Sequence, residues 1–146
     1  IPQTYKTLKL IISARGDTIG DVATQNRMQI NGSSSTVVSD RGLYGSGSAA
    51  SSGSRTSQAY MRNTSVVDAN ATANTFGSVC FDLPNYSGSA NKTFSADGVT
   101  ENNGTESYQE LTAGLWANTS AITSLVLTPN AGNYVAGSTF SLYGLA

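Results

Sequence analysis

The residues that most directly suggest chemistry in this sequence are four carboxylates within one stretch, Asp97, Glu101, Glu106 and Glu110. Carboxylates on adjacent loops can hold Ca²⁺, which takes about six to eight oxygen ligands. Two carboxylates that face each other across a cleft can instead hydrolyse a glycosidic bond. The sequence contains no D-x-D-x-D-G calcium loop, and its spacing does not show which carboxylates face each other. A solvated turn explains the same residues, so we predict no bound metal here.

The sequence contains no histidine and a single cysteine, Cys80. A chain without histidine lacks the usual general base near neutral pH, the usual partner of a serine or cysteine nucleophile, and an imidazole for zinc. Cys80 lies between Val79 and Phe81 in a strand-like run, which indicates a packed thiol and not a nucleophile. We therefore predict a protein that is not an enzyme, with no catalytic residue and no cofactor.

Two further stretches match known binding motifs in their letters. Arg15-Gly16-Asp17 spells an adhesion tripeptide, but Gly and Asp are also typical of a turn after a strand. The run Gly42–Gly53 carries closely spaced glycines, but a phosphate cradle needs a buried strand before it, a helix after it and usually a lysine. The turn and the polar loop are therefore the preferred interpretations.

Aromatic side chains offer a third possible chemistry, the stacking of a sugar ring. The chain has one tryptophan and seven tyrosines, and the candidates for glycan contact are Tyr44, Tyr86 and Trp116. The alternative is ordinary packing, because aromatic residues of β proteins commonly lie half-buried with the hydroxyl group at the rim.

The charge of the chain argues against a nucleic-acid partner. Charged residues make up 12% of the sequence and the net charge is −1, whereas an average soluble domain has about 25% charged residues. The basic residues are dispersed and form no stripe that could neutralise a phosphate backbone. The sequence also has no run of about 18 apolar residues that could span a membrane.

The composition favours short strands joined by polar turns. Ser, Thr, Gly and Asn together account for 65 of the 146 residues, and all four are poor helix formers. Apolar residues alternate with polar ones in several runs, as in Leu8, Leu10 and Ile12, and this period of two is typical of a half-buried strand. We predict one all-β domain over residues 1–146, an antiparallel, jelly-roll-like β-sandwich of about eight strands.

Three details of this prediction concern particular segments. The glycine- and serine-rich run Gly45–Ser54 is expected to form a mobile surface loop. The segment ELTAGLWA, residues 110–117, can also be read as a short helix, although its Thr and Gly disfavour one. The chain is expected to close on a β-hairpin that turns near Pro129 and Gly132, with Leu125, Leu127, Phe140 and Leu142 facing one core.

Residues 1–15, 91–116 and 121–145 together resemble a family of small virion structural proteins of tailed bacteriophages, common in aquatic phages. The similarity rests on a leading I-P-Q-x-Y-x-x-L-x-L run, an L-W-x-x-T-x-A-I-T-S segment and a closing G-x-x-x-x-x-S-x-x-S-L-Y-G, in that order. The resemblance implies a β-sandwich on the virion surface. Members typically carry a short β-rich lead-in before the first run, so the resemblance implies that one strand of the sandwich is either missing here or supplied otherwise.

The resemblance implies a structural function, as a capsid decoration or cement protein or as part of a fibre or tail appendage. It supplies no catalytic motif. The expected partners are further copies of the chain, in a trimer by analogy with symmetric virion assemblies, and major capsid or tail proteins. The alternative function is a lectin-like module that recognises host glycans.

Overall fold

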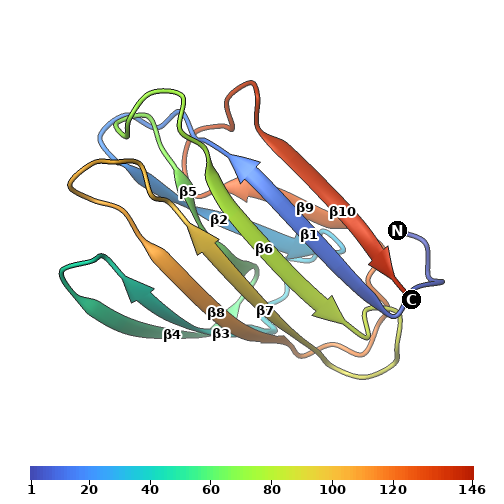
Figure 1. Cartoon of the computed structure of the whole chain (residues 1–146). Coiled ribbons are helices and arrows are strands. Elements are labelled where there is room, and N and C mark those ends of the chain that lie inside the picture. Colours follow the sequence, from blue (N-terminus) through green and yellow to red (C-terminus); the bar gives the residue numbers. More distant parts are fainter.

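The computed structural model has ten strands in two antiparallel sheets that lie face to face (Figure 1). It describes residues 1–146, with the side chain of Asn63 left out of the description. The strands are β1 (Thr7–Ala14), β2 (Ala23–Ile30), β3 (Val38–Gly45), β4 (Ala50–Gln58), β5 (Met61–Val67), β6 (Gly77–Pro84), β7 (Lys92–Val99), β8 (Gln109–Trp116), β9 (Leu125–Pro129) and β10 (Thr139–Leu145). The larger sheet has the strand order β10-β1-β6-β7-β8-β3-β4, and the smaller has the order β5-β2-β9.

The predicted all-β sandwich is confirmed. The ten strands exceed the eight expected, and they divide seven and three, less evenly than in an eight-stranded jelly roll. No helix occurs in the part of the chain that the structure describes, and residues 110–117 fall mostly in strand β8. Accordingly, the described residues include no helix long and apolar enough to cross a membrane.

The core lies between the two sheets and follows from the alternation seen in the sequence. Strand β1 buries Leu8, Leu10 and Ile12, and strand β6 buries every second residue in the same way. The rings of Phe81 and Phe94 stack at the centre, with 5.1 Å between their centroids. The smaller sheet closes this core with its own buried side chains, which include Met28, Ile30, Met61 and Val66.

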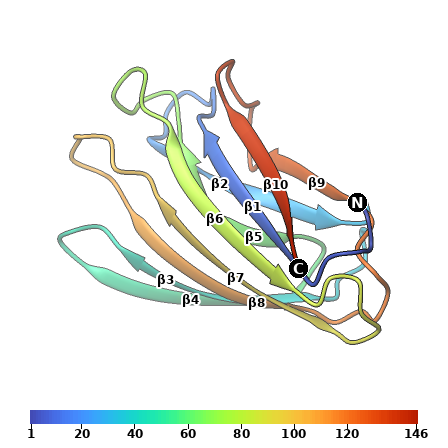
Figure 2. The ribbon, with the colours of Figure 1, turned by 45° about the vertical axis from the view of Figure 1, so that its right-hand side comes forward.

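The two sheets differ in width, and the smaller one covers only the middle of the larger. Strand β5 lies against β6, β7 and β8, and Figure 2 shows the large sheet curving past the three strands behind it. The two edge strands of the large sheet, β4 and β10, are mostly exposed. Part of the inward-facing side of the large sheet therefore remains open to solvent.

The predicted C-terminal hairpin is wrong. Strand β9 pairs with β2 in the smaller sheet and β10 pairs with β1 in the larger, so the chain crosses between sheets at this point. Gly132 does adopt the positive φ that the turn prediction required, 65°. Contacts with residues far away in the chain hold the crossing segment in place. For example, the amide of Asn133 donates to Asp17 Oδ1 over 2.7 Å. Local sequence does not reveal such contacts.

The predicted surface loop at Gly45–Ser54 is also mostly wrong. The turn is short, with Ser46 N bonded to the carbonyl of Ala49, and Ala50–Ser54 already belong to strand β4. An edge strand with solvent on both faces needs no apolar alternation, because its pairing to β3 comes from backbone hydrogen bonds. This is why a low-complexity stretch forms a strand here.

Removal of the Phe81 ring tests the assignment of the core. Phe81 is 1% exposed, so Phe81→Ala should lower the free energy of unfolding by about 3–5 kcal/mol. The sequence pattern alone predicts about 2–5 kcal/mol for Leu127→Ala. Because Leu127 is only partly buried on β9, the structure places its loss at about 2 kcal/mol or less. Urea unfolding followed by the fluorescence of the buried Trp116 measures both losses, and an undiminished stability of Phe81→Ala would contradict the fold.

Candidate binding cleft and exposed sheet face

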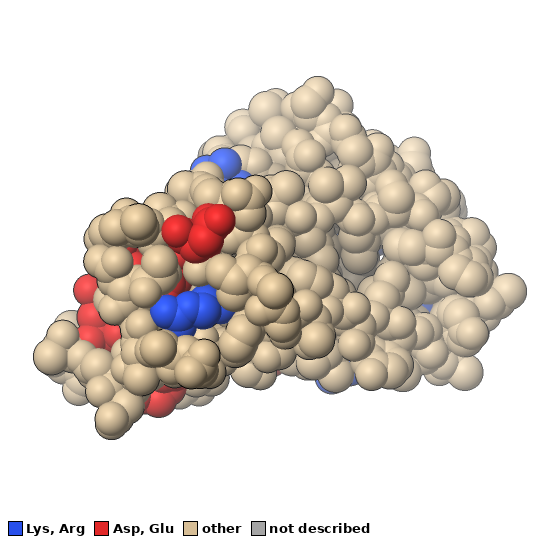
Figure 3. Space-filling model, turned by 90° about the horizontal axis from the view of Figure 1, so that it is seen from above, with Lys and Arg blue, Asp and Glu red and all other residues tan. Residues whose placement is uncertain are grey.

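A polar cleft of about 560 Å³ opens between the sheets where the smaller sheet ends. Pockets of about 300–1,000 Å³ are typical of sites for small ligands. Both sheets contribute to its wall, which includes Asp21, Tyr44, Arg62, Glu106, Tyr108 and Glu110. In Figure 3 the visible Lys, Arg, Asp and Glu side chains gather mainly on the side where the β3–β4 and β7–β8 turns lie in Figure 1.

The register of the large sheet brings these residues together. Opposed residues of paired antiparallel strands lie on the same face, and one such row runs through Ile12, Val79, Gly98, Glu110 and Tyr44. The row is apolar under the smaller sheet and becomes polar beyond it. The side chains of the cleft are therefore the continuation of the core into the uncovered part of the sheet.

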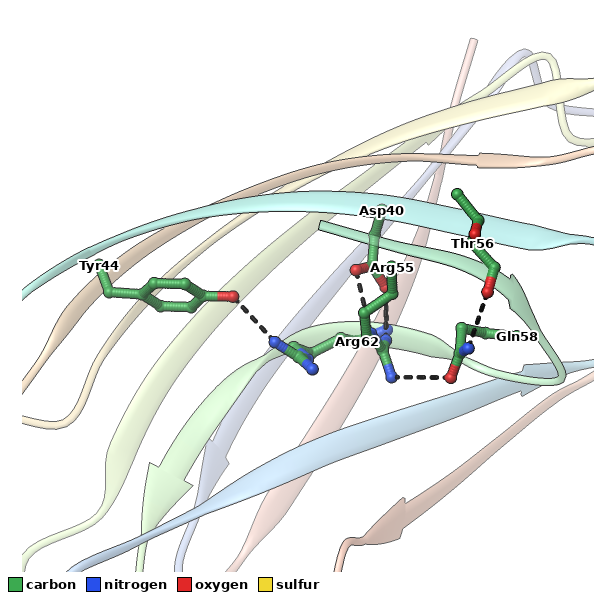
Figure 4. Close-up of polar contacts among 6 residues, drawn as sticks. All are labelled: Asp40, Tyr44, Arg55, Thr56, Gln58 and Arg62. Carbon is green, nitrogen blue, oxygen red and sulfur yellow. Dashed lines mark hydrogen bonds and ion pairs between the residues drawn. The ribbon is translucent and has the colours of Figure 1, made fainter. Parts of the chain in front are cut away.

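Tyr44 is held in a fixed position on the wall of this cleft. A Cβ atom added at Gly42 would lie 2.5 Å from the Tyr44 hydroxyl oxygen, and one added at Gly53 would lie 3.6 Å from the ring. The ring thus lies across two positions that lack side chains. Arg62 Nη1 on β5 donates to the Tyr44 hydroxyl over 2.8 Å (Figure 4), which ties the ring to the opposite sheet.

Glu110 is the buried carboxylate of the cleft. Its side chain accepts hydrogen bonds from the amide of Ser65 at 2.5 Å and from the Ser65 hydroxyl at 3.1 Å. Burial raises the pKa of Glu110 above its ordinary value of 4.5, whereas the bonds from Ser65 and the charge of Arg62 oppose this shift. Glu110 therefore joins β8 to β5 at the base of the cleft.

Glu106 and Tyr108 lie at the rim, in the segment before β8. The Tyr108 hydroxyl donates to Glu106 Oε1. This hydrogen bond is the main cause that raises the pKa of Tyr108 to about 12, with burial and nearby carboxylates as smaller causes. The pair places a carboxylate and an aromatic ring at the entrance of the cleft.

An ion pair next to the cleft connects strands β3 and β4 (Figure 4). Arg55 on the edge strand β4 binds Asp40 on β3 with two nitrogens, and Arg55 Nε donates to Asp40 Oδ1 over 3.1 Å. Asp40 is 4% exposed. Tyr60 lies between two guanidinium groups, with Arg27 at 4.4 Å and Arg55 at 4.9 Å from its ring centroid. These contacts link both sheets at the point where apolar packing ends.

The three aromatic residues predicted to contact glycans divide between cleft and core. Tyr44 lines the cleft. Tyr86 and Trp116 are 0% and 2% exposed, so neither presents a ring to a ligand. The Tyr86 hydroxyl donates to the carbonyl of Pro2, and the Lys92 ammonium lies 5.5 Å from the centroid of Trp116. For these two residues the packing alternative holds. Arg62 and Tyr108, which the sequence analysis did not single out, take their place.

Of the four carboxylates of residues 97–110, Glu106 and Glu110 both line the cleft, whereas Asp97 and Glu101 lie outside its lining. Asp97 lies opposite Leu111 and so faces away from the core, whereas Glu110 faces inward. Glu101 accepts hydrogen bonds from Asn103 N and Ser107 Oγ within its own turn. Among the described side chains, no group of three or more potential metal ligands of the His, Cys, Asp or Glu type is found.

The Arg15-Gly16-Asp17 tripeptide is part of the fold's internal bonding. The Arg15 guanidinium donates to four backbone carbonyls in the segment Ala69–Thr75. Asp17 accepts from the amide of Asn133 at 2.7 Å. The two charged groups are therefore engaged within the molecule. The predicted turn is wrong at these residues, because Arg15 and Gly16 form β-bridges to Val67 and Tyr134 and the turn begins only at Ile19.

The outward side of the large sheet, here called the outer face, exposes several large apolar side chains. One register row runs through Ile11, Cys80, Asp97, Leu111 and Leu43. Its apolar members Ile11, Leu111 and Leu43 are 42%, 51% and 60% exposed. Val99, Tyr143 and Leu145 are further exposed apolar residues of this face. Cys80 is half-buried there and not in the core. The sequence signal for this face is an apolar residue at a position where a half-buried strand would have a polar one, as at Ile11 beside the buried Ile12.

Comparison with known proteins adds no family assignment. No family model matches the chain, and no curated protein or solved structure shows significant similarity to it. Function must therefore be argued from the cleft and the outer face.

Breaking the Asp40–Arg55 pair should destabilise the protein. Asp40→Ala leaves the charge of Arg55 without its buried partner, and we expect a loss of about 3 kcal/mol of unfolding free energy. This loss lies at the lower end of the range of about 3–5 kcal/mol for breaking a buried ion pair. The reason is that Arg55 is on an edge strand and can turn toward solvent. The matched control is Lys9→Met, which removes the exposed Lys9–Asp82 pair and should leave stability nearly unchanged. Equal effects of the two variants in urea unfolding would contradict the bracing role.

The raised pKa of Glu110 predicts a pH-dependent stability. The folded state holds this proton more tightly than the unfolded state, so the contribution is fully present below pH 4.5 and is lost as pH rises through the folded-state pKa. Glu110→Gln removes this loss. The thermal midpoint of the variant relative to the native protein should thus be higher at about pH 7.5 than at about pH 4. Circular dichroism melts at the two pH values measure this, and a difference of opposite sign would refute the assignment.

Proposed function

We propose that the chain is a non-enzymatic structural protein of a bacteriophage particle, displayed on the virion surface as a decoration or cement protein or as part of a fibre or tail appendage. The resemblance of residues 1–15, 91–116 and 121–145 to virion structural proteins supports the phage context. The β-sandwich fold is compatible with it. The observation that best supports an assembly role is the outer face, because exposed apolar patches of this kind mark interaction surfaces.

The occupant that best fits the outer face is a second copy of the same chain. The charged side chains of this face balance, with Lys9 and Arg41 against Asp82 and Asp97, and Lys9 is already paired with Asp82 over 3.4 Å. A neighbouring copy in a closed ring can therefore cover the exposed apolar side chains while its charges meet opposite charges of this face. A partner of strong net charge has no matching surface on this face.

The proposed assembly is a homo-oligomer, with a trimer as the arrangement that suits both capsid threefold axes and fibres. Major capsid or tail proteins are the proposed further partners. No enzymatic step, nucleic-acid contact or membrane contact forms part of this proposal. Density for a sandwich of seven and three strands on the surface of the purified phage particle would support it, and particles that lack the chain would refute it.

A charge placed on the outer face should disrupt the oligomer without unfolding the protein. Leu111→Asp puts a second carboxylate between Asp97 and the exposed Leu43 side chain, and burial of an unpaired charge opposes association. Mass photometry should show a shift from oligomer to monomer. The thermal midpoint of the monomeric variant should match that of the native monomer at low concentration.

Ile19→Asp is the matched control, because Ile19 is 88% exposed and lies in the loop between β1 and β2. It should leave the oligomer intact. Cys80 supplies an independent probe, since its thiol lies on the outer face. Its reaction with a thiol reagent should slow in the native oligomer and recover in Leu111→Asp. Loss of the oligomer in both variants, or a Cys80 thiol that reacts equally fast in oligomer and monomer, would refute the interface.

A further inference from the structure

The cleft between the sheets has the features of a binding site that is independent of the outer face. It lies on the inward side of the large sheet, whereas the proposed assembly surface lies on the outward side. Its volume of about 560 Å³ is enough for a ligand of several rings. Residues from β3, β5 and β8 meet in it, so the site exists only in the folded sandwich.

The aromatic component of the site is preorganised. The Tyr44 ring lies across Gly42 and Gly53, and its hydroxyl is fixed by Arg62. A ring held this way loses little conformational freedom on binding, which favours affinity. The flat carbon-bound hydrogen face of a pyranose is an apolar surface that packs on such a ring. Tyr108 adds a second aromatic group at the entrance.

The polar component suits hydroxyl groups. Glu106 and Glu110 supply carboxylate acceptors, Arg62 supplies donors, and Ser51 and Ser65 add hydroxyls to the same wall. Arg62 Nε is buried and has no hydrogen-bond partner within the described part of the protein. Sugar hydroxyls both donate and accept, so they can pair with acceptors and donors placed side by side. A purely apolar ligand would remove these groups from water without offering them further hydrogen bonds.

The charge of the wall narrows the ligand class. Asp21, Glu106 and Glu110 contribute carboxyl groups against the single guanidinium of Arg62 among the lining residues named for the cleft. This excess of acidic groups disfavours uronic acids, sialic acids and phosphorylated glycans. Neutral sugars meet no such repulsion, and their hydroxyls can donate to the carboxylates.

We propose that this cleft binds a neutral oligosaccharide, with one pyranose ring stacked on Tyr44 and its hydroxyls bonded to Glu106 and Arg62. The inference goes beyond the structural function, since it gives the particle surface a site for host glycans. It does not depend on the oligomer, and the two can fail separately.

The test is a titration of ¹⁵N-labelled protein with four neutral probes, cellotetraose, maltotetraose, mannotetraose and chitotetraose, each up to about 10 mM, a range suited to weak binding. Tetragalacturonate serves as the anionic comparison. At least one neutral probe should shift the amide signals of Tyr44, Ser51 and Arg62, and tetragalacturonate should bind at least about tenfold more weakly. Absence of shifts with all four neutral probes, or shifts confined to other surfaces, would overturn the proposal.

Three variants locate the site for the probe that binds. Tyr44→Ala should weaken binding at least about tenfold, and Glu106→Gln, which changes an exposed side chain, should weaken it without affecting the fold. Tyr143→Ala is the control, because it removes an equally large tyrosine that is 51% exposed on the outer face. Thermal melts confirm that each variant is folded. Unchanged affinity in both cleft variants, or an equal loss in Tyr143→Ala, would overturn the proposal.

Discussion

A sheet of three strands covers only part of a sheet of seven, and most other features of this protein follow from that difference in width. Where β5 lies over β6, β7 and β8, alternate side chains of the large sheet pack as an apolar core. Beyond that region the same inward-facing rows continue without a covering layer. Toward β3 and β4 polar groups replace apolar ones, whereas at the other edge Phe140 and Leu142 of β10 stay apolar and are 39% and 42% exposed. The cleft is thus a consequence of the fold and not a separate addition to it.

The uncovered end needs bonds that act over a distance, because apolar packing no longer holds the sheets together. Arg55 with Asp40, Glu110 with Ser65, and Arg62 with Tyr44 each link different strands, and the last two link different sheets. Each such contact fixes a side chain that also faces the cleft or lies beside it. The interactions that stabilise this end are therefore the same ones that preorganise the proposed sugar site. The outer face is separate, since its side chains point the other way and its apolar groups remain available for assembly.

Local sequence patterns were sufficient for the parts of the fold that depend on one strand at a time. The alternation of Leu8, Leu10 and Ile12, and that of Val79, Phe81 and Leu83, predicts buried faces that the structure confirms. Features that depend on partners far away in the chain were missed. The carbonyl groups that bind Arg15 lie more than 50 residues from it, and the burial of Trp116 depends on packing between separate segments. Likewise, no local signal marks Arg62 as the partner of Tyr44, since the pairing follows only from how the sheets stack.

Hydrogen exchange of individual amides tests the central claim, that cover by the smaller sheet decides which parts of the large sheet are rigid. The amides of β6, between β1 and β7 and beneath β5, should exchange only through global unfolding. Those of β4, which pairs with β3 alone and has mostly exposed side chains, should exchange through local opening and at least about tenfold faster. Equal protection of β4 and β6 would show that the wide sheet is held uniformly, and it would contradict the account.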